Sequence, residues 1–217
     1  CIYNIYKFMS GTEMKQMSIR KILQALYYIQ KNTPETNESK TAPVFLLKML
    51  YFADRYHLRH FGILGSGDEY FAMKKGPVAS ATMDILKGKW PQKANSAEIE
   101  LLKEVVELDE FSVLIKEQDD DELSLSFKEA LDFSLQTFGK YEWNELSRIS
   151  HDYPEWKKHE GEVRKNPYSR YPMKLKDFFS DPVCKTNLKL CRIEEDPFKD
   201  DTVFLNAMRD EIDRLSC

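Results

Sequence analysis

The sequence lacks any uninterrupted apolar stretch of about 18 residues, the length that a membrane-spanning helix requires. Its first residues also lack the basic start and the long apolar core of a secretory signal peptide. We therefore expect a cytoplasmic protein with no membrane partner. Residues 1–17 precede the first clear helical pattern, and we predict that they form an N-terminal extension.

Cysteine is scarce, and its spacing matches neither a disulfide framework nor a CxxC pair. The chain has 4 cysteines, of which two are terminal: Cys1, Cys184, Cys191 and Cys217. This layout favours reduced thiols with a structural or incidental place in the fold. A metal site or a bridge at Cys184 and Cys191 is the alternative.

The signatures of common enzyme classes are also absent. The sequence has no GxSxG motif and no glycine-rich nucleotide loop. His57 and His60 lie one turn after Asp54, but a HExxH zinc motif needs a different spacing and a glutamate. His151 precedes Asp152, and neighbouring side chains rarely face each other. We expect no catalytic residue, metal or cofactor; a metal-dependent hydrolase that uses these histidines and nearby carboxylates is the alternative.

An excess of positive charge is missing as well. Lysine and arginine number 32 against 36 acidic residues, which gives a net charge of -4 and a pI near 5.7. No overall field attracts the protein to phosphate backbones, so a nucleic-acid partner is not expected. Residues 157–176 form a local basic patch, which predicts either a solvated linker or contact with an acidic partner. Because of this patch, a DNA-binding regulator is an alternative function.

The residues that are present favour a globular domain. The chain of 217 residues is 42% hydrophobic and 12% aromatic, enough for one sizeable core. Apolar residues at helical spacing predict a helix from Ser18, which serves as its N-cap. A second helix is predicted from Thr41, its N-cap, to Phe61, with Gly62 as its stop. Its polar side is predicted to carry Lys48, Asp54, Arg55 and Arg59.

A short strand is predicted to follow this aromatic helix. Residues 69–74 alternate in polarity, and Gly76 and Pro77 should end the strand because proline cannot continue a ladder of hydrogen bonds. Proline suits the first turn of a helix, so we predict a helix from Pro77 to Leu86. The strand would then be pinned between two helices.

The second half of the chain alternates between helical and extended patterns. Residues 96–118 predict a helix or extended piece and then a strand at 111–117, and residues 119–122 form an acidic turn that could also hold a hard cation. Helices are predicted at 124–138 and 141–149, followed by a turn anchored by Trp156. Residues 166–172 suggest irregular structure, and the pattern at 203–215 predicts a closing helix.

Together these patterns predict a predominantly helical α+β fold, with helices packed around a small antiparallel sheet or hairpin. We predict one principal domain at residues 18–158 and a C-terminal extension at 159–217 that includes the closing helix.

Three blocks of the sequence carry a resemblance to a known family. They read, in chain order, LLKMLYFADRYHLRHFG, GDEYFAMKKGPV and WNELSRISHDYPEWK. In this order they resemble the Panacea domain family, also described as SocA-like antitoxin domains and found in proteins labelled phage-associated. The resemblance extends over about residues 19–156.

The resemblance implies a mostly helical domain with a small sheet. It implies an antitoxin that neutralises a protein toxin encoded nearby through direct contact, with a protease as a further partner where the antitoxin acts as an adaptor. It supplies no catalytic residues. The expected partner-binding or family-motif residues are Asp68, Glu69, Tyr70, Met73, Lys74, Gly76, Pro77, His151 and Trp156.

Overall fold

The computed structural model describes residues 17–91 and 94–199. The α-helices in this part are α2 (Ile19–Asn32), α3 (Pro43–Phe61), α4 (Ser80–Leu86), α5 (Ser96–Val105), α6 (Leu125–Phe138), α7 (Trp143–Ser150), α8 (Pro154–Lys157), α9 (Glu160–Lys165) and α10 (Thr186–Leu190). A 3-10 helix, η1, covers Leu175–Phe179. The strands are β1 (Tyr70–Met73), β2 (Gly76–Ala79), β3 (Val106–Leu108), β4 (Val113–Ile115) and β5 (Tyr171–Pro172). The predicted α+β fold with mostly helical content is confirmed.

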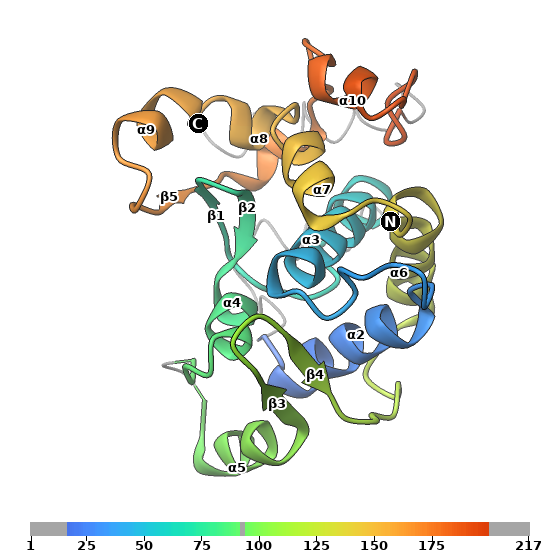
Figure 1. Cartoon of the computed structure of the whole chain (residues 1–217), viewed down its shortest axis with the longest axis vertical. Coiled ribbons are helices and arrows are strands. Elements are labelled where there is room, and N and C mark those ends of the chain that lie inside the picture. The colour runs from blue at the N-terminus through green and yellow to red at the C-terminus, as the bar shows by residue number, and fades with distance from the viewer. Residues whose placement is uncertain (1–16, 92–93, 200–217) are drawn as a thin grey trace.

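Helix α3 lies at the centre, with α2 and α6 beside it and the β1–β2 hairpin along its flank (Figure 1). It begins with Pro43 in its first turn and ends at Gly62, which adopts the left-handed conformation with φ 77°. Aromatic side chains from distant segments pack on it; Phe52, for example, stacks on Phe138 with ring centroids 4.0 Å apart. The predicted limits of this helix are confirmed apart from its N-cap, which is Ala42 rather than Thr41.

The predicted polar side of α3 is wrong. Lys48, Asp54, Arg55 and Arg59 are each at most 1% exposed. Helices, strands and the C-terminal segment surround α3, so these side chains find hydrogen-bond partners inside the protein instead of solvent. Sequence spacing on one helix cannot show this, because the partners lie far along the chain.

The larger sheet has the order β2-β1-β5 and is antiparallel. The predicted helix start at Pro77 is wrong: Pro77 lies in β2, opposite Ala72 of β1, and the helix α4 begins at Ser80. Proline is tolerated there because β2 is an edge strand, where one side of the backbone has no neighbouring strand. The segment predicted as irregular contains β5, whose Tyr171 lies opposite Ala72.

The smaller sheet is the antiparallel β3–β4 hairpin, which follows α5 and lies at one end of the molecule (Figure 1). The predicted strand at 111–117 is therefore confirmed in its central residues, Val113–Ile115. The predicted N-cap Ser18 is confirmed, and of the two serines at the start of the helix predicted at 124–138, Ser124 and Ser126, the first is the N-cap; each of the two caps accepts a backbone N–H of the first helical turn.

The C-terminal segment contributes to the same core as the helices before it. Phe178, Phe179 and Phe198 are at most 1% exposed, and the ring centroids of Tyr51 and Phe178 lie 6.0 Å apart. The expected extension at 1–17, apart from Met17, and the expected closing helix at 203–215 lie outside the described residues. None of the helices in the described part is both long enough and apolar enough to cross a membrane.

Candidate functional site

The expected partner-binding residues gather at the β1–β2 hairpin and at the α7–α8 turn beside it. Strands β1 and β2 are joined by Lys74 and Lys75, which are exposed. Gly76 follows with φ 102°, a conformation that side chains rarely adopt. The structure thus presents two lysines at the tip of a hairpin.

Two side chains from the third motif block hold this tip. Trp156 donates its Nε1–H to the carbonyl oxygen of Met73 at 2.9 Å. Ser147 donates its hydroxyl to the carbonyl oxygen of Lys75 at 2.7 Å. Because these carbonyl groups lie on either side of the turn, the hydrogen bonds fix its backbone against α7 and α8.

Lys48 of α3 lies beneath the hairpin, fully enclosed. Its Nζ donates to the carbonyl oxygen of Pro77 at 2.6 Å. A Cβ at Gly76 would lie 2.8 Å from this Nζ and 2.3 Å from Ser150 Oγ, so only glycine fits. Burial, reinforced by the nearby charge of Lys75, lowers the pKa of Lys48 to about 7.

His151 lies against the same support. Its ring stacks on Trp156, with centroids 3.7 Å apart and planes 12° apart. Burial and the charge of Lys48 lower the pKa of His151 to about 3, so the ring is neutral at physiological pH. Its Nε2 is buried and has no hydrogen-bond partner among the described residues.

Asp68 accepts hydrogen bonds from the start of α4, at the end of the β1–β2 hairpin opposite its tip. It accepts hydrogen bonds from the backbone N–H groups of Ala81 at 3.0 Å and Thr82 at 2.8 Å, and from the Thr82 hydroxyl. Helix α4 has no cap from its own N-cap residue, Ala79. Asp68 therefore caps α4 from a distance, and it is only 4% exposed.

Tyr70 belongs to a second buried network with Asp54 of α3. Tyr70 donates its hydroxyl to Asp54 Oδ2 at 2.7 Å, and the backbone N–H of Ser66 donates to Asp54 Oδ1 at 2.8 Å. Burial raises the pKa of Asp54 to about 6, although these hydrogen bonds oppose the rise. The network ties β1 and the loop before it to α3.

A buried ion pair connects α3 to α8. Arg55 Nη1 donates to Glu155 Oε1 at 2.5 Å, and both side chains are 0% exposed. Tyr51 donates its hydroxyl to the same carboxylate, and Arg55 Nη2 donates to the carbonyl oxygen of Ser180 at 2.8 Å. Sequence reasoning missed Glu155 and misplaced Arg55 on a solvated face. The signal for Arg55 was the width of the apolar surface of α3, which leaves little room for a solvent-facing side.

The nine expected residues therefore divide by exposure. Glu69 and Lys74 are exposed, and Met73 and His151 are partly exposed. The remaining five are buried or nearly so: Asp68, Tyr70, Gly76, Pro77 and Trp156. The structure brings them together around one hairpin, and most of them act there as internal support.

The histidines considered for a metal site do not converge. His57 Nδ1 lies 2.8 Å from the carbonyl oxygen of Ile63, and its Nε2 lies 3.0 Å from Ser126 Oγ. Asp152 accepts from Asn187 Nδ2 at 2.6 Å rather than orienting His151. Within residues 17–91 and 94–199, no group of three or more His, Cys, Asp or Glu side chains is arranged to hold a metal ion.

The two described cysteines form no bridge, and many side chains of the basic segment are paired with acidic ones. Cys184 is exposed and Cys191 is buried, and both are free, so the bridge considered for them is not formed. In residues 157–176, four of the seven basic side chains have internal acidic partners: Lys157–Glu160, Lys158–Asp177, Arg164–Glu160 and Arg170–Asp84. Much of the basic charge is therefore compensated locally.

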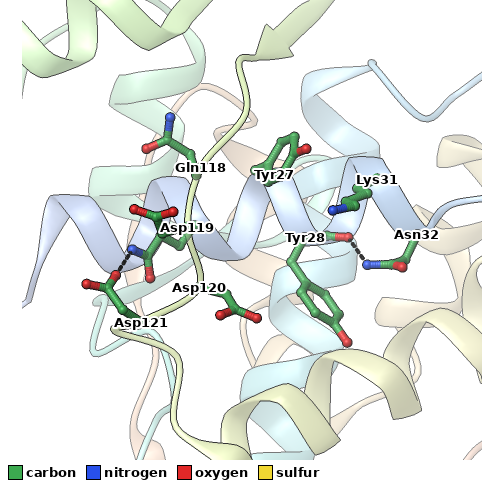
Figure 2. A pocket seen from close by; sticks show the side chains of 9 residues that line it. Tyr27, Tyr28, Lys31, Asn32, Gln118, Asp119, Asp120 and Asp121 are labelled. Atoms are coloured by element: carbon green, nitrogen blue, oxygen red, sulfur yellow. Dashed lines mark hydrogen bonds between the residues drawn. The ribbon is translucent and has the colours of Figure 1, made fainter.

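A surface pocket of about 510 Å³ lies between α2 and the acidic segment (Figure 2). Tyr27, Tyr28 and Lys31 form one wall, and residues 118–121 form the other. The carboxylate of Asp121 accepts from Gln24 Nε2 at 2.5 Å and from Arg20 Nη2 at 3.1 Å. Asp120 pairs with Lys128 at 2.6 Å. The acidic turn is thus bound to neighbouring side chains as well as exposed to solvent.

Comparison with known proteins agrees with the resemblance in the sequence. A scan of protein families matches residues 46–157 to the family described as antitoxin SocA-like, Panacea domain. Searches of curated proteins and of solved structures give no significant match. The matched residues contain most of α3, both hairpins and the α7–α8 turn, and they make up more than half of the chain. The chain belongs to the family of SocA-like antitoxins with a Panacea domain.

Proposed function

We propose that this protein acts as an antitoxin that neutralises a protein toxin by binding it directly. The observation that carries the proposal is the match of residues 46–157 to the SocA-like Panacea domain. In this proposal the protein is not an enzyme, needs no cofactor, and acts through a surface in the cytoplasm. Its partner is the product of a neighbouring reading frame.

The hydrogen bonds of the motif residues support a role in positioning a surface. The side chains of Trp156, Ser147 and Lys48 all end on backbone carbonyl groups of the β1–β2 hairpin. Groups arranged in this way hold a segment of the chain in place. The motif blocks are then interpreted as a framework for a binding surface.

The tip of the β1–β2 hairpin is the surface that this framework presents. Lys74 and Lys75 are exposed, and the Lys75 ammonium lies 4.4 Å from the ring centroid of Trp143, which is 37% exposed. A charged group beside an aromatic ring is a common element of protein interfaces. We propose that Met73 and Lys74 are the motif residues that a partner reaches at this tip, and that Glu69 is accessible to it at the other end of the hairpin.

Co-expression tests the proposed function. The neighbouring reading frame is induced in a heterologous host alone and together with this protein, and growth and toxin abundance are followed. The proposal predicts growth arrest by the neighbour alone and rescue on co-expression with toxin abundance unchanged. Rescue with a fall in toxin abundance would instead indicate a protease adaptor, and a harmless neighbour or persistent arrest would contradict the proposal.

Charge reversal at the hairpin tip tests the contact residues. We expect Lys74→Glu to weaken binding of the purified neighbouring protein about tenfold, because it places an acid where the partner meets a base. Lys189→Glu, which reverses an exposed lysine of α10, is the control. Equal affinities of the two variants would remove Lys74 from the contact, while leaving the co-expression result unaffected.

A further inference from the structure

The β3–β4 hairpin exposes large apolar side chains within a short segment. Phe111 is 78% exposed and Leu114 is 50% exposed. Leu108 is 46% exposed, but it lies opposite Val113 and therefore belongs to the other face of the hairpin from Leu114. Isolated exposed apolar residues are normal on protein surfaces, but a cluster on one element is typical of a binding surface. The β1–β2 framework does not account for this cluster, because the motif residues described above hold the other hairpin.

The hairpin is held firmly by α2. Gln30 donates its Nε2–H to the carbonyl oxygen of Val113 at 2.6 Å, and its Oε1 accepts the N–H of Ile115 at 2.9 Å. The N–H of Val113 donates to the carbonyl oxygen of Thr41 at 2.8 Å. The side-chain amide of Gln30 thus replaces a neighbouring strand at the edge of β4. A partner on this hairpin meets fixed side chains, and strand addition at that edge is blocked.

The register places apolar and acidic side chains together. Leu114 lies opposite Glu107, so both belong to the same face of the hairpin, and Phe111 lies in the turn. Asp109 and Glu110 lie in the same turn, directly before Phe111, and are exposed. The surface therefore has an apolar centre and an acidic rim, which is the common arrangement of a protein interface.

The charge of the surrounding segment extends this pattern. Residues 96–122 contain eleven acidic side chains and two basic ones. They include α5, both strands of the hairpin and the acidic wall of the pocket in Figure 2. The α5–β3–β4 unit lies at one end of the molecule and the helices α8, α9 and α10 lie toward the other (Figure 1). Glu107, Asp120 and Asp121 have ion-pair partners in Lys116, Lys128 and Arg20. The acidic excess that remains in the segment attracts a basic surface and accelerates its association.

We propose that the β3–β4 hairpin is the docking surface for a basic protein surface with an apolar hollow that receives Phe111. This inference rests on the proposed function, because its occupant is the toxin. Basic side chains of the toxin meet Glu107, Asp109 and Glu110, while the aromatic ring and Leu114 lose their contact with water. The toxin contacts this hairpin whether or not it also reaches the tip of β1–β2.

A second copy of this chain fits the hairpin less well. Two hairpins that face each other would oppose their acidic rims. In a head-to-tail arrangement the complementary charge would come from residues 157–176, where four of the seven basic side chains already have internal ion pairs. The charge therefore favours a different, basic protein.

Two variants and two matched controls test the inference with the product of the neighbouring reading frame as the probe. Phe111→Ser removes the exposed ring and is compared with Tyr168→Ser, which removes a ring that is 90% exposed elsewhere. Glu107→Lys/Glu110→Lys reverses the acidic rim and is compared with Glu194→Lys/Glu195→Lys, where both glutamates are exposed. Dissociation constants are measured at low and high salt, and growth rescue is followed in parallel.

We expect each hairpin variant to weaken binding about tenfold or more and each control to bind like the wild type. The wild-type affinity should fall with salt, and the salt dependence should shrink in the Glu107→Lys/Glu110→Lys variant. If both hairpin variants bind with wild-type affinity and still rescue growth, the inference is overturned and the proposed function is not. A wild-type protein that neither binds nor rescues would overturn the proposed function as well. Concentration-dependent self-association that Phe111→Ser abolishes would assign the hairpin to a second copy and overturn the inference.

Discussion

Lys48 lies in an environment opposite to the expected one. A solvated place was predicted, yet its ammonium group lies beneath the β1–β2 hairpin, where burial lowers its pKa from 10.5 to about 7. Between these values the unfolded chain binds a proton at Lys48 and the folded protein does not. Protonation therefore favours unfolding, and the contribution of Lys48 to stability rises with pH from about 7 to about 10.5.

A Lys48→Met variant tests this environment. Between pH 7 and pH 9 the free energy of unfolding of the wild type should rise by about 2 kcal/mol relative to that of the variant, since one pKa unit corresponds to about 1.4 kcal/mol. Urea unfolding at several pH values measures this difference. Lys189→Met, at an exposed lysine, is the matched control. A constant difference for Lys48→Met would mean that the amine is solvated or paired.

Gly76 permits the close approach of the hairpin to Lys48. Gly76→Ala should destabilise the protein by about 2–4 kcal/mol, because it combines a positive φ with contacts of 2.3 and 2.8 Å from the new Cβ. Gly161→Ala is the matched control, since nothing lies within 4 Å of its Cβ. That control should be neutral or slightly stabilising in α9. Chemical unfolding of both variants gives the comparison, and equal stability would show that the hairpin can move away from α3.

At the level of elements, the hydrogen bond from Trp156 fixes β1 to α8. Trp156→Phe retains an aromatic ring for His151 but removes the donor to the Met73 carbonyl oxygen. We expect a loss of about 1–2 kcal/mol of stability and faster amide exchange in β1 and β2. Trp143→Phe, at a partly exposed ring, should change stability by less than about 0.5 kcal/mol. Unchanged exchange in the hairpin would contradict a supporting role for Trp156.

The elements that could be predicted from the sequence have local signals. Helix α2 has its serine cap and α3 has Pro43 and Gly62 at its ends, so nearby residues determine where they begin and end. Strand β2 was missed because Pro77 is equally compatible with a helix start, and only its place at a sheet edge decides between the two. The sequence around Pro77 describes only local preference, whereas the strand forms because Pro77 pairs with Ala72 of β1.

The chemistry of the candidate site could not be predicted from the sequence. The motif blocks named residues of the β1–β2 hairpin and of the α7–α8 turn, but only the structure shows that these two regions contact each other. The roles of Arg55 and Asp68 depend on Glu155, on Ser180 and on the backbone of α4, and such contacts have no local signature. Propensity and spacing describe one element at a time, whereas buried hydrogen bonds are determined by several.

At the scale of the whole molecule, the described C-terminal segment completes the core around α3. Phe178 and Phe198 are fully buried, and Phe198 lies 5.3 Å from the ring of Tyr153 between centroids. Arg59 Nη1 donates to the carbonyl oxygen of Phe178 at 3.0 Å, and Tyr153 donates its hydroxyl to Asp196 at 3.2 Å. The family match ends at residue 157, so the core of this protein extends past the matched region.

This arrangement predicts the behaviour of a chain that ends at residue 158, the boundary proposed from the sequence. The truncation removes Phe178, Phe179 and Phe198 from the core, and loss of one buried phenylalanine side chain costs about 3–5 kcal/mol. The combined loss is comparable to the usual stability of a domain, about 5–15 kcal/mol. We expect the truncated chain to lack a cooperative thermal transition and near-UV circular dichroism, both of which the full chain should show. A sharp transition in the truncated chain would instead establish residues 18–158 as a domain that folds independently, with the later residues packed onto a finished core.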